Sequence, residues 1–185
     1  MKVRFSILVM LFAFFATSVV SAQTKTWKVG DIYDVNGKQG VVFEVWDGGR
    51  HGKIVSLDEA DLLWSINERY IDVTFDESDG KANTDKVMAC RDKDQYPAFR
   101  WCRAKGADWY LPAKDELWTI FANMWTINKT LNQYGQVLNK TTYWSSTGGI
   151  YDGLGSAWYV DMNGGYTSHI YNLSARYSVR AVSAF

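Results

Sequence analysis

Two histidines and two cysteines are the residues of this sequence best suited to bind a transition metal. His51, Cys90, Cys102 and His169 are widely spaced. Structural zinc sites usually draw their ligands from closely spaced pairs, and this spacing matches none of them. We therefore expect no metal site and no cofactor. His51 follows a glycine turn and is expected at the surface, whereas His169 lies in a polar strand and is a candidate contact residue.

Cys90 and Cys102 leave two alternatives open. They are twelve positions apart, which on one straight helix is about 18 Å and too far for a disulfide. A break near Tyr96 and Pro97 would fold the segment back and allow the bond, which an oxidising compartment favours. The other alternative is a pair of buried free thiols. Cys102 is expected to be helical and to face the core, so a catalytic role for it has the least support.

The sequence shows no recognisable set of residues for general acid and base catalysis. Asp115 and Glu116 are adjacent, so they point to different sides of their helix and form no acid/base pair. The sequence contains no nucleophile elbow, phosphate loop or dinucleotide fingerprint. We predict that the protein is not an enzyme. The enzymatic alternative is a charged cleft acting on a periplasmic or surface substrate, and its candidate residues are Glu44, Asp47, Arg176 and Arg180.

Aromatic residues are the most distinctive feature of the chain, which has 9 Trp and 11 Tyr. Most single tryptophans are explained by the core, but this number exceeds what a core of this size needs. Tyr, Asn, Ser and Gly are concentrated between positions 148 and 177, a mixture typical of adaptable binding surfaces. The alternative is that they are ordinary strand residues. The predicted ligand-binding residues are Tyr151, Tyr159, Tyr166, His169, Tyr171, Asn172 and Tyr177.

Strand and turn patterns dominate the first part of the chain. Residues 29–57 predict a three-stranded meander, with turns at Asn36-Gly37 and at positions 47–49. Residues 58–78 give no clear pattern and are interpreted as an irregular connector. A short helical turn capped by Asn83 or Thr84 is expected to run through Met88.

Two further helices and a second group of strands follow. One helix has Pro97 in its first turn and stops at Gly106. The next presents Leu117, Ile120, Phe121 and Met124 as one apolar stripe, and its Glu116 is placed to reach the amides of the first turn. Strands are predicted at 143–147, 157–162, 166–174 and 177–185, with a glycine-rich loop at 148–156. The order of elements predicts an α+β fold in which terminal strands can pair.

The N-terminus has the pattern of a secretory signal peptide. Lys2 and Arg4 precede an apolar run, and small residues end it at positions 20–22. We expect cleavage after Ala22, leaving residues 23–185 as a single exported domain with no membrane-spanning segment. The chain has 20 Lys and Arg and 20 Asp and Glu. Without a basic face, nucleic acid is not an expected partner.

Several segments in the same order resemble DUF1566-type (Lcl C-terminal-like) domains of Bacteroidetes. The segments are VGDIYDVNGKQGVVFEV, HGKIVSL, NTDKV, YPAFRWCRAKG, WYLPAKDEL, YWSST, AWYV, NGG and VRAVSAF. Together they span nearly all of residues 23–185. The resemblance implies a C-type-lectin-like fold: a mixed, mostly antiparallel sheet, two or three flanking helices, and long C-terminal loops that form a ligand face. The sequence is more distantly similar to formylglycine-generating enzymes and to retroelement-diversified variable proteins.

The departures from those relatives bear on function. Formylglycine-generating enzymes use a late cysteine pair, and no cysteine follows Cys102 here. The E-P-N or Q-P-D loop of calcium-dependent lectins is also missing, and Asp152, Asp161 and Asn163 are too few for a calcium shell. We therefore expect a noncatalytic module that binds a glycan or a surface protein through its C-terminal aromatic region. The other alternative is a structural subunit of a surface assembly.

Overall fold

The computed structural model describes residues 25–67, 76–138, 142–151 and 154–185. The predicted signal peptide, Asp152 and the side chain of Tyr151 lie outside this description. None of the helices within it is both long enough and apolar enough to cross a membrane.

The N-terminal sheet has four antiparallel strands in the order β1-β2-β3-β9. The predicted meander is confirmed, and its first turn has φ values of 53° at Asn36 and 79° at Gly37, as an Asn-Gly hairpin turn requires. The last strand pairs with β3, which confirms that terminal strands meet. The bounds are β1 Ile32–Val35, β2 Lys38–Trp46, β3 His51–Val55 and β9 Val182–Ala184.

The second sheet has five strands in the order β4-β8-β5-β6-β7. Its pairs are antiparallel except for β5 and β8, which run parallel. The α+β class is therefore confirmed, although the strands form two sheets and not one. Strand β4 also corrects the interpretation of residues 58–78 as wholly irregular. The bounds are β4 Ala60–Leu63, β5 Thr142–Tyr151, β6 Leu154–Asp161, β7 Tyr166–Ile170 and β8 Arg176–Val179.

The glycine-rich segment at 148–156 is not a long loop, as the sequence had suggested. Its two halves extend β5 and β6, with Gly148 opposite Ala157 and Gly149 opposite Ser156. Small residues face one another here, and Ser156 donates a hydrogen bond to the Gly149 carbonyl at 3.3 Å. Backbone pairing therefore orders residues whose composition alone suggests a loop.

Within the described residues, four α-helices lie between β4 and β5 in the chain. The first begins at Gly80, earlier than predicted, because Asp79 caps it by accepting from the Ala82 N–H at 2.8 Å. The predicted apolar stripe is buried at Leu117 and Ile120, but the helix ends before Asn123, which donates to the Phe43 carbonyl. The bounds are α1 Gly80–Ala89, α2 Pro97–Ala104, α3 Lys114–Ala122 and α4 Met124–Leu131.

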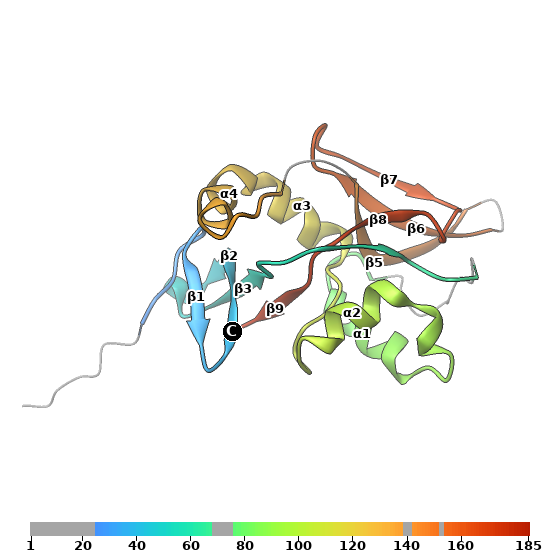
Figure 1. Cartoon of the computed structure of the whole chain (residues 1–185), viewed down its shortest axis with the longest axis horizontal. Helices are drawn as coiled ribbons and strands as arrows, with labels where there is room; N and C mark the ends of the chain where they lie inside the picture. The colour runs from blue at the N-terminus through green and yellow to red at the C-terminus, as the bar shows by residue number, and fades with distance from the viewer. Residues whose placement is uncertain (1–24, 68–75, 139–141, 152–153) are drawn as a thin grey trace, which may run out of the picture.

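Helix α3 links the two sheets (Figure 1). It contacts β2 of the first sheet and both β5 and β6 of the second. Its Glu116 accepts hydrogen bonds from the N–H groups of Ala113 at 2.8 Å and Gly80 at 3.2 Å, which confirms the predicted capping by this carboxylate and also holds the start of α1 against α3. Helices α1 and α2 pack on the other side of β5 and β4.

Candidate functional site: an aromatic recognition surface

Strand register distributes the predicted contact residues over the two faces of the second sheet. Tyr159 lies opposite Trp144 on β5 and opposite Ser168 on β7, while Asp161 lies opposite Tyr166. Side chains directly opposite each other in a sheet share a face. Tyr159, Asp161 and Tyr166 therefore lie on one face, together with Trp144.

Three tyrosines converge on that face, and we call Tyr159, Tyr166 and Tyr177 the tyrosine cluster. The rings of Tyr159 and Tyr177 meet edge to face with centroids 5.4 Å apart. Burial and the neighbouring phenols of Tyr159 and Tyr166 raise the pKa of Tyr177. The charge of the Asp161 carboxylate raises the pKa of Tyr166, which is 52% exposed. The hydroxyls of Tyr166 and Tyr177, whose pKa values are raised, are therefore neutral donors at physiological pH.

The base of the tyrosine cluster is rigid. Trp144 is fully buried beneath Tyr177, with ring centroids 4.4 Å apart. Its indole N–H donates to the Leu62 carbonyl on β4 at 3.0 Å. Tyr159 and Tyr177 are half-buried against this base and keep part of each ring open. Rings held in this way lose little side-chain entropy when a partner binds.

A hollow of about 370 Å³ lies along β8 and includes Tyr177 in its lining. The Ser178 hydroxyl donates to the Asp61 carboxylate at 3.0 Å, and Arg176 donates to the Asp61 carbonyl at 2.9 Å. Because side chains alternate along β8, those of Arg176 and Ser178 lie on the opposite face of the sheet from the Tyr177 ring, as does Asp61, which pairs with Ser178. The lining residues of the hollow are Asp61, Thr142, Arg176, Tyr177 and Ser178.

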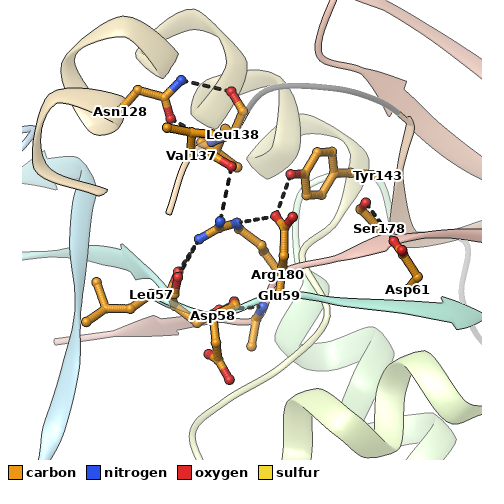
Figure 2. Close-up of polar contacts among 12 residues, drawn as sticks. Leu57, Asp58, Glu59, Asp61, Asn128, Val137, Leu138, Tyr143, Ser178 and Arg180 are labelled. Carbon is orange, nitrogen blue, oxygen red and sulfur yellow. Dashed lines mark hydrogen bonds and ion pairs between the residues drawn. The ribbon is translucent and has the colours of Figure 1, made fainter. Parts of the chain in front are cut away.

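An ion pair between the buried Arg180 and the partly exposed Glu59 fixes the strand that carries Tyr177 (Figure 2). Arg180 follows β8 directly and donates to the Glu59 carboxylate at 2.9 Å and to the Ser56 carbonyl at 2.8 Å. The Tyr143 hydroxyl donates to the same carboxylate at 2.7 Å, and burial together with this bond raises the pKa of Tyr143. The guanidinium also donates to the carbonyls of Leu57 and Val137.

The four charged residues considered for an enzymatic cleft are dispersed. Arg180 is 1% exposed and serves as this internal anchor, which corrects its proposed place in a cleft. Glu44 and Asp47 belong to the N-terminal sheet region, where they pair with Lys53 at 3.3 Å and Arg50 at 2.5 Å. Only Arg176 borders the hollow along β8.

The remaining predicted contact residues do not join the tyrosine cluster. His169 lies opposite Trp158 on the other face of the sheet, with ring centroids 5.2 Å apart, and contacts Tyr171 at 5.7 Å. Asn172 accepts hydrogen bonds from the backbone and hydroxyl of Ser174 and so shapes a turn. The predicted contact residues therefore belong to two separate surfaces. Tyr151 is assigned to neither, because its side chain lies outside the described residues.

Both cysteines are free thiols, so of the two alternatives the structure has the unbonded one. Cys102 is buried in α2, as expected, and burial raises the pKa of its thiol. Cys90 is only half-buried. Within the described part of the chain, no three His, Cys, Asp or Glu side chains are grouped closely enough to hold a metal ion.

The Asp161 carboxylate accepts hydrogen bonds from the N–H groups of Asn163 and Gly164, both at 2.8 Å.

Sequence reasoning missed the buried Trp144 as the base of the tyrosine cluster, and it missed Asp61 and Thr142 as lining residues of the hollow along β8. A signal for part of the cluster was present, because the Asn163-Gly164-Gly165 turn sets the hairpin register and so places Asp161 opposite Tyr166. The approach of β8 to β5 leaves no comparable signal, since these strands pair in parallel after a long separation.

Comparison with known proteins finds a solved structure with a similar fold but no matching protein family. No protein-family model matches the sequence, and no curated protein matches it. A solved structure of a fimbrial protein from Bacteroides ovatus is similar, with a TM-score of 0.64 and 16% sequence identity over 86% of this chain and 49% of that chain. This chain therefore spans about half the length of that protein. At this identity, the likeness shows that the two share a fold.

Proposed function

We propose that this chain is a noncatalytic recognition module of the cell surface, and that it binds a glycan or a surface protein through the tyrosine cluster. The observation that carries the proposal is the convergence of Tyr159, Tyr166 and Tyr177, partly open, over a buried tryptophan. Tyrosine combines a large apolar area with a hydroxyl that both donates and accepts, which suits it to recognition of many ligands.

The polar groups around the cluster favour binding over catalysis. Asp161 is held by the backbone of its own turn, and Asp61 accepts from Ser178. A general acid or base needs to reach a substrate atom directly. The Asp161 carboxylate instead holds the backbone of the turn that precedes Tyr166.

An exported location is supported by two independent observations. The N-terminal sequence has the pattern of a signal peptide. The similar solved structure is a fimbrial protein. The sequence resemblance to DUF1566-type domains supports the same proposal. In a C-type-lectin-like arrangement, the second sheet would present the ligand face.

The fimbrial neighbour also favours a second candidate function, a structural subunit of a surface assembly. Strand β7 lies at the end of the strand order of the second sheet, so its outer edge is a site where another strand can pair. Concentration-dependent self-association of the purified protein, measured by sedimentation, would support this alternative. A monomer that binds a ligand supports the recognition module.

An array of glycans and surface proteins tests the proposed function. The exported protein is compared with a triple variant, Tyr159→Phe, Tyr166→Phe and Tyr177→Phe, which keeps all three rings and removes their hydroxyls. We expect the triple variant to bind the selected ligand at least tenfold more weakly, which corresponds to about 1.4 kcal/mol. The matched control is Tyr134→Phe, which changes a tyrosine that is 44% exposed outside this sheet. Equal binding by the triple variant and the wild type contradicts the proposal.

A further inference from the structure

A second hollow, with a volume of about 480 Å³, lies between the start of α3 and the turn that leads into β7. It shares no lining residue with the hollow along β8. One of its walls is the indole of Trp118, which is 44% exposed. The lining residues are Lys114, Asp115, Trp118, Gly165, Tyr166 and Thr167.

Close packing fixes the two walls relative to each other. Gly165 has φ of +63°, and a Cβ atom built on it would lie 2.3 Å from the Phe121 ring. The turn therefore lies directly on Phe121. The Phe121 ring in turn contacts the Trp118 ring, with centroids 5.3 Å apart and planes inclined by 30°. Trp118 is thus supported from behind while one part of its ring stays open to the hollow.

The polar groups of the hollow carry little net positive charge. The ammonium of Lys114 pairs with Glu77 at 2.7 Å and lies 4.8 Å from the centroid of the Trp158 ring. Asp115 is exposed and accepts a hydrogen bond from the Ser78 hydroxyl at 2.9 Å. Thr167 adds an exposed hydroxyl from β7. The one cation of the hollow is therefore already neutralised, which disfavours an anionic ligand.

The size and chemistry of this hollow suit a small, hydroxylated ligand. Its volume lies in the range of small-molecule sites, whereas a stable protein interface buries about 800 Å² on each partner. A pyranose ring has an apolar face of C–H groups and a rim of hydroxyls. The open indole of Trp118 complements the apolar face, and a carboxylate with a hydroxyl beside it complements the rim.

We propose that this hollow binds the pyranose ring of a neutral sugar, stacked on Trp118, with the Asp115 carboxylate accepting hydrogen bonds from the sugar hydroxyls. Thr167 supplies a further hydroxyl partner at the opposite wall. The proposal does not rest on the tyrosine cluster, although Tyr166 borders both surfaces. It adds a small-molecule site to the recognition surface described above.

The test uses the methyl glycosides of glucose, galactose, mannose and N-acetylglucosamine as probes in calorimetric titrations of the exported protein. At least one of them is expected to bind saturably. Trp118→Ala is expected to weaken that binding at least tenfold, and Asp115→Asn several-fold. The matched control is Trp125→Ala, since Trp125 is 73% exposed and has the Lys129 ammonium 3.6 Å from its ring centroid. This control is expected to bind like the wild type.

A second measurement on the wild type is independent of whether any variant folds. The indole N–H resonance of Trp118 is expected to shift during the sugar titration, whereas that of Trp125 is not. Tyr177→Phe, which alters the tyrosine cluster alone, is expected to leave sugar binding unchanged, so failure of the two proposals is distinguishable. The inference is overturned if none of the four sugars binds, if Trp118→Ala binds like the wild type, if Trp125→Ala loses binding equally, or if methyl glucuronide binds more tightly than every neutral sugar.

Discussion

Arg180 organises the interior of the molecule through a single side chain. Its guanidinium donates hydrogen bonds to the Glu59 carboxylate and to the carbonyls of Ser56 and Leu57, all in the segment that joins β3 to β4. Only arginine presents enough planar donors to satisfy a carboxylate and several carbonyls together. Because Arg180 directly follows β8, these bonds also set the position of Tyr177.

We expect Arg180→Met to lower the free energy of unfolding by about 3–5 kcal/mol, because it leaves a partly buried carboxylate and several carbonyls without their donor. The matched control is Arg176→Met at the start of β8, where the side chain is exposed. A surface change of this kind costs about 0.5 kcal/mol or less. Urea unfolding of both variants provides the measurement, and similar midpoints for the two would show that Arg180 is not an anchor.

The role of Arg180 illustrates what single residues reveal in a sequence. Arg180 was a candidate for a charged cleft because arginine is mostly exposed in proteins, whereas its burial here depends on partners distant in sequence. Glu116, by contrast, was interpreted correctly as a cap, because its partner at Ala113 is local. Local hydrogen bonds are accessible to sequence reasoning, whereas those of Arg180 span 121 positions to Glu59.

Among the elements, strand periodicity and turn signals were the most informative. The meander of β1, β2 and β3 and the helix that begins at Pro97 were predicted from Asn-Gly turns and from the position of proline. The glycine-rich part of β5 and β6 was not, because ladder pairing there outweighs the low strand propensity of glycine. Strand β4 was missed because its four residues acquire order from pairing with β8.

The turn before β7 provides a test at the scale of elements, since it places the wall that carries Tyr166. We expect Gly165→Ala to destabilise the protein clearly more than Gly48→Ala. Both glycines have left-handed φ values, +63° and +65°, where another residue costs about 1–3 kcal/mol. Only the Cβ at Gly165 would collide with Phe121, whereas nothing lies within 4 Å of the Cβ at Gly48.

Denaturant unfolding of the two alanine variants measures this difference. The common backbone cost cancels in the comparison, so the remainder reports the contact between the turn and α3. Equal losses of stability in the two variants would mean that the turn moves away from Phe121 freely. In that case the wall of the second hollow would not be fixed.

At the scale of the whole molecule, the C-terminal strands pair with strands from the first part of the chain. Strand β9 completes the N-terminal sheet beside β3, and β8 pairs with β4 in the second sheet (Figure 1). The order of strands, helices and strands predicted this closure in kind, and the α+β class with it. It did not predict two sheets, because the division depends on the turn of the chain at Arg180, between β8 and β9.

The tyrosine cluster was predicted only in part for the same reason. Tyr159, Tyr166 and Tyr177 were all named from composition, but so were His169 and Tyr171, which lie on the opposite face. Composition identifies residues suited to recognition, whereas strand register and the parallel approach of β8 to β5 decide which of them meet.

Mapping of backbone amide shifts by NMR, with the ligand selected by the array, tests the central claim most directly. The tyrosine cluster as the recognition surface predicts that the largest shifts fall on Tyr159, Tyr166 and Tyr177 and on the neighbouring Thr142 and Asp161. Shifts confined to the N-terminal sheet and α4 would contradict the claim. Shifts limited to the hollow at Trp118 would also contradict it, while supporting the separate sugar site.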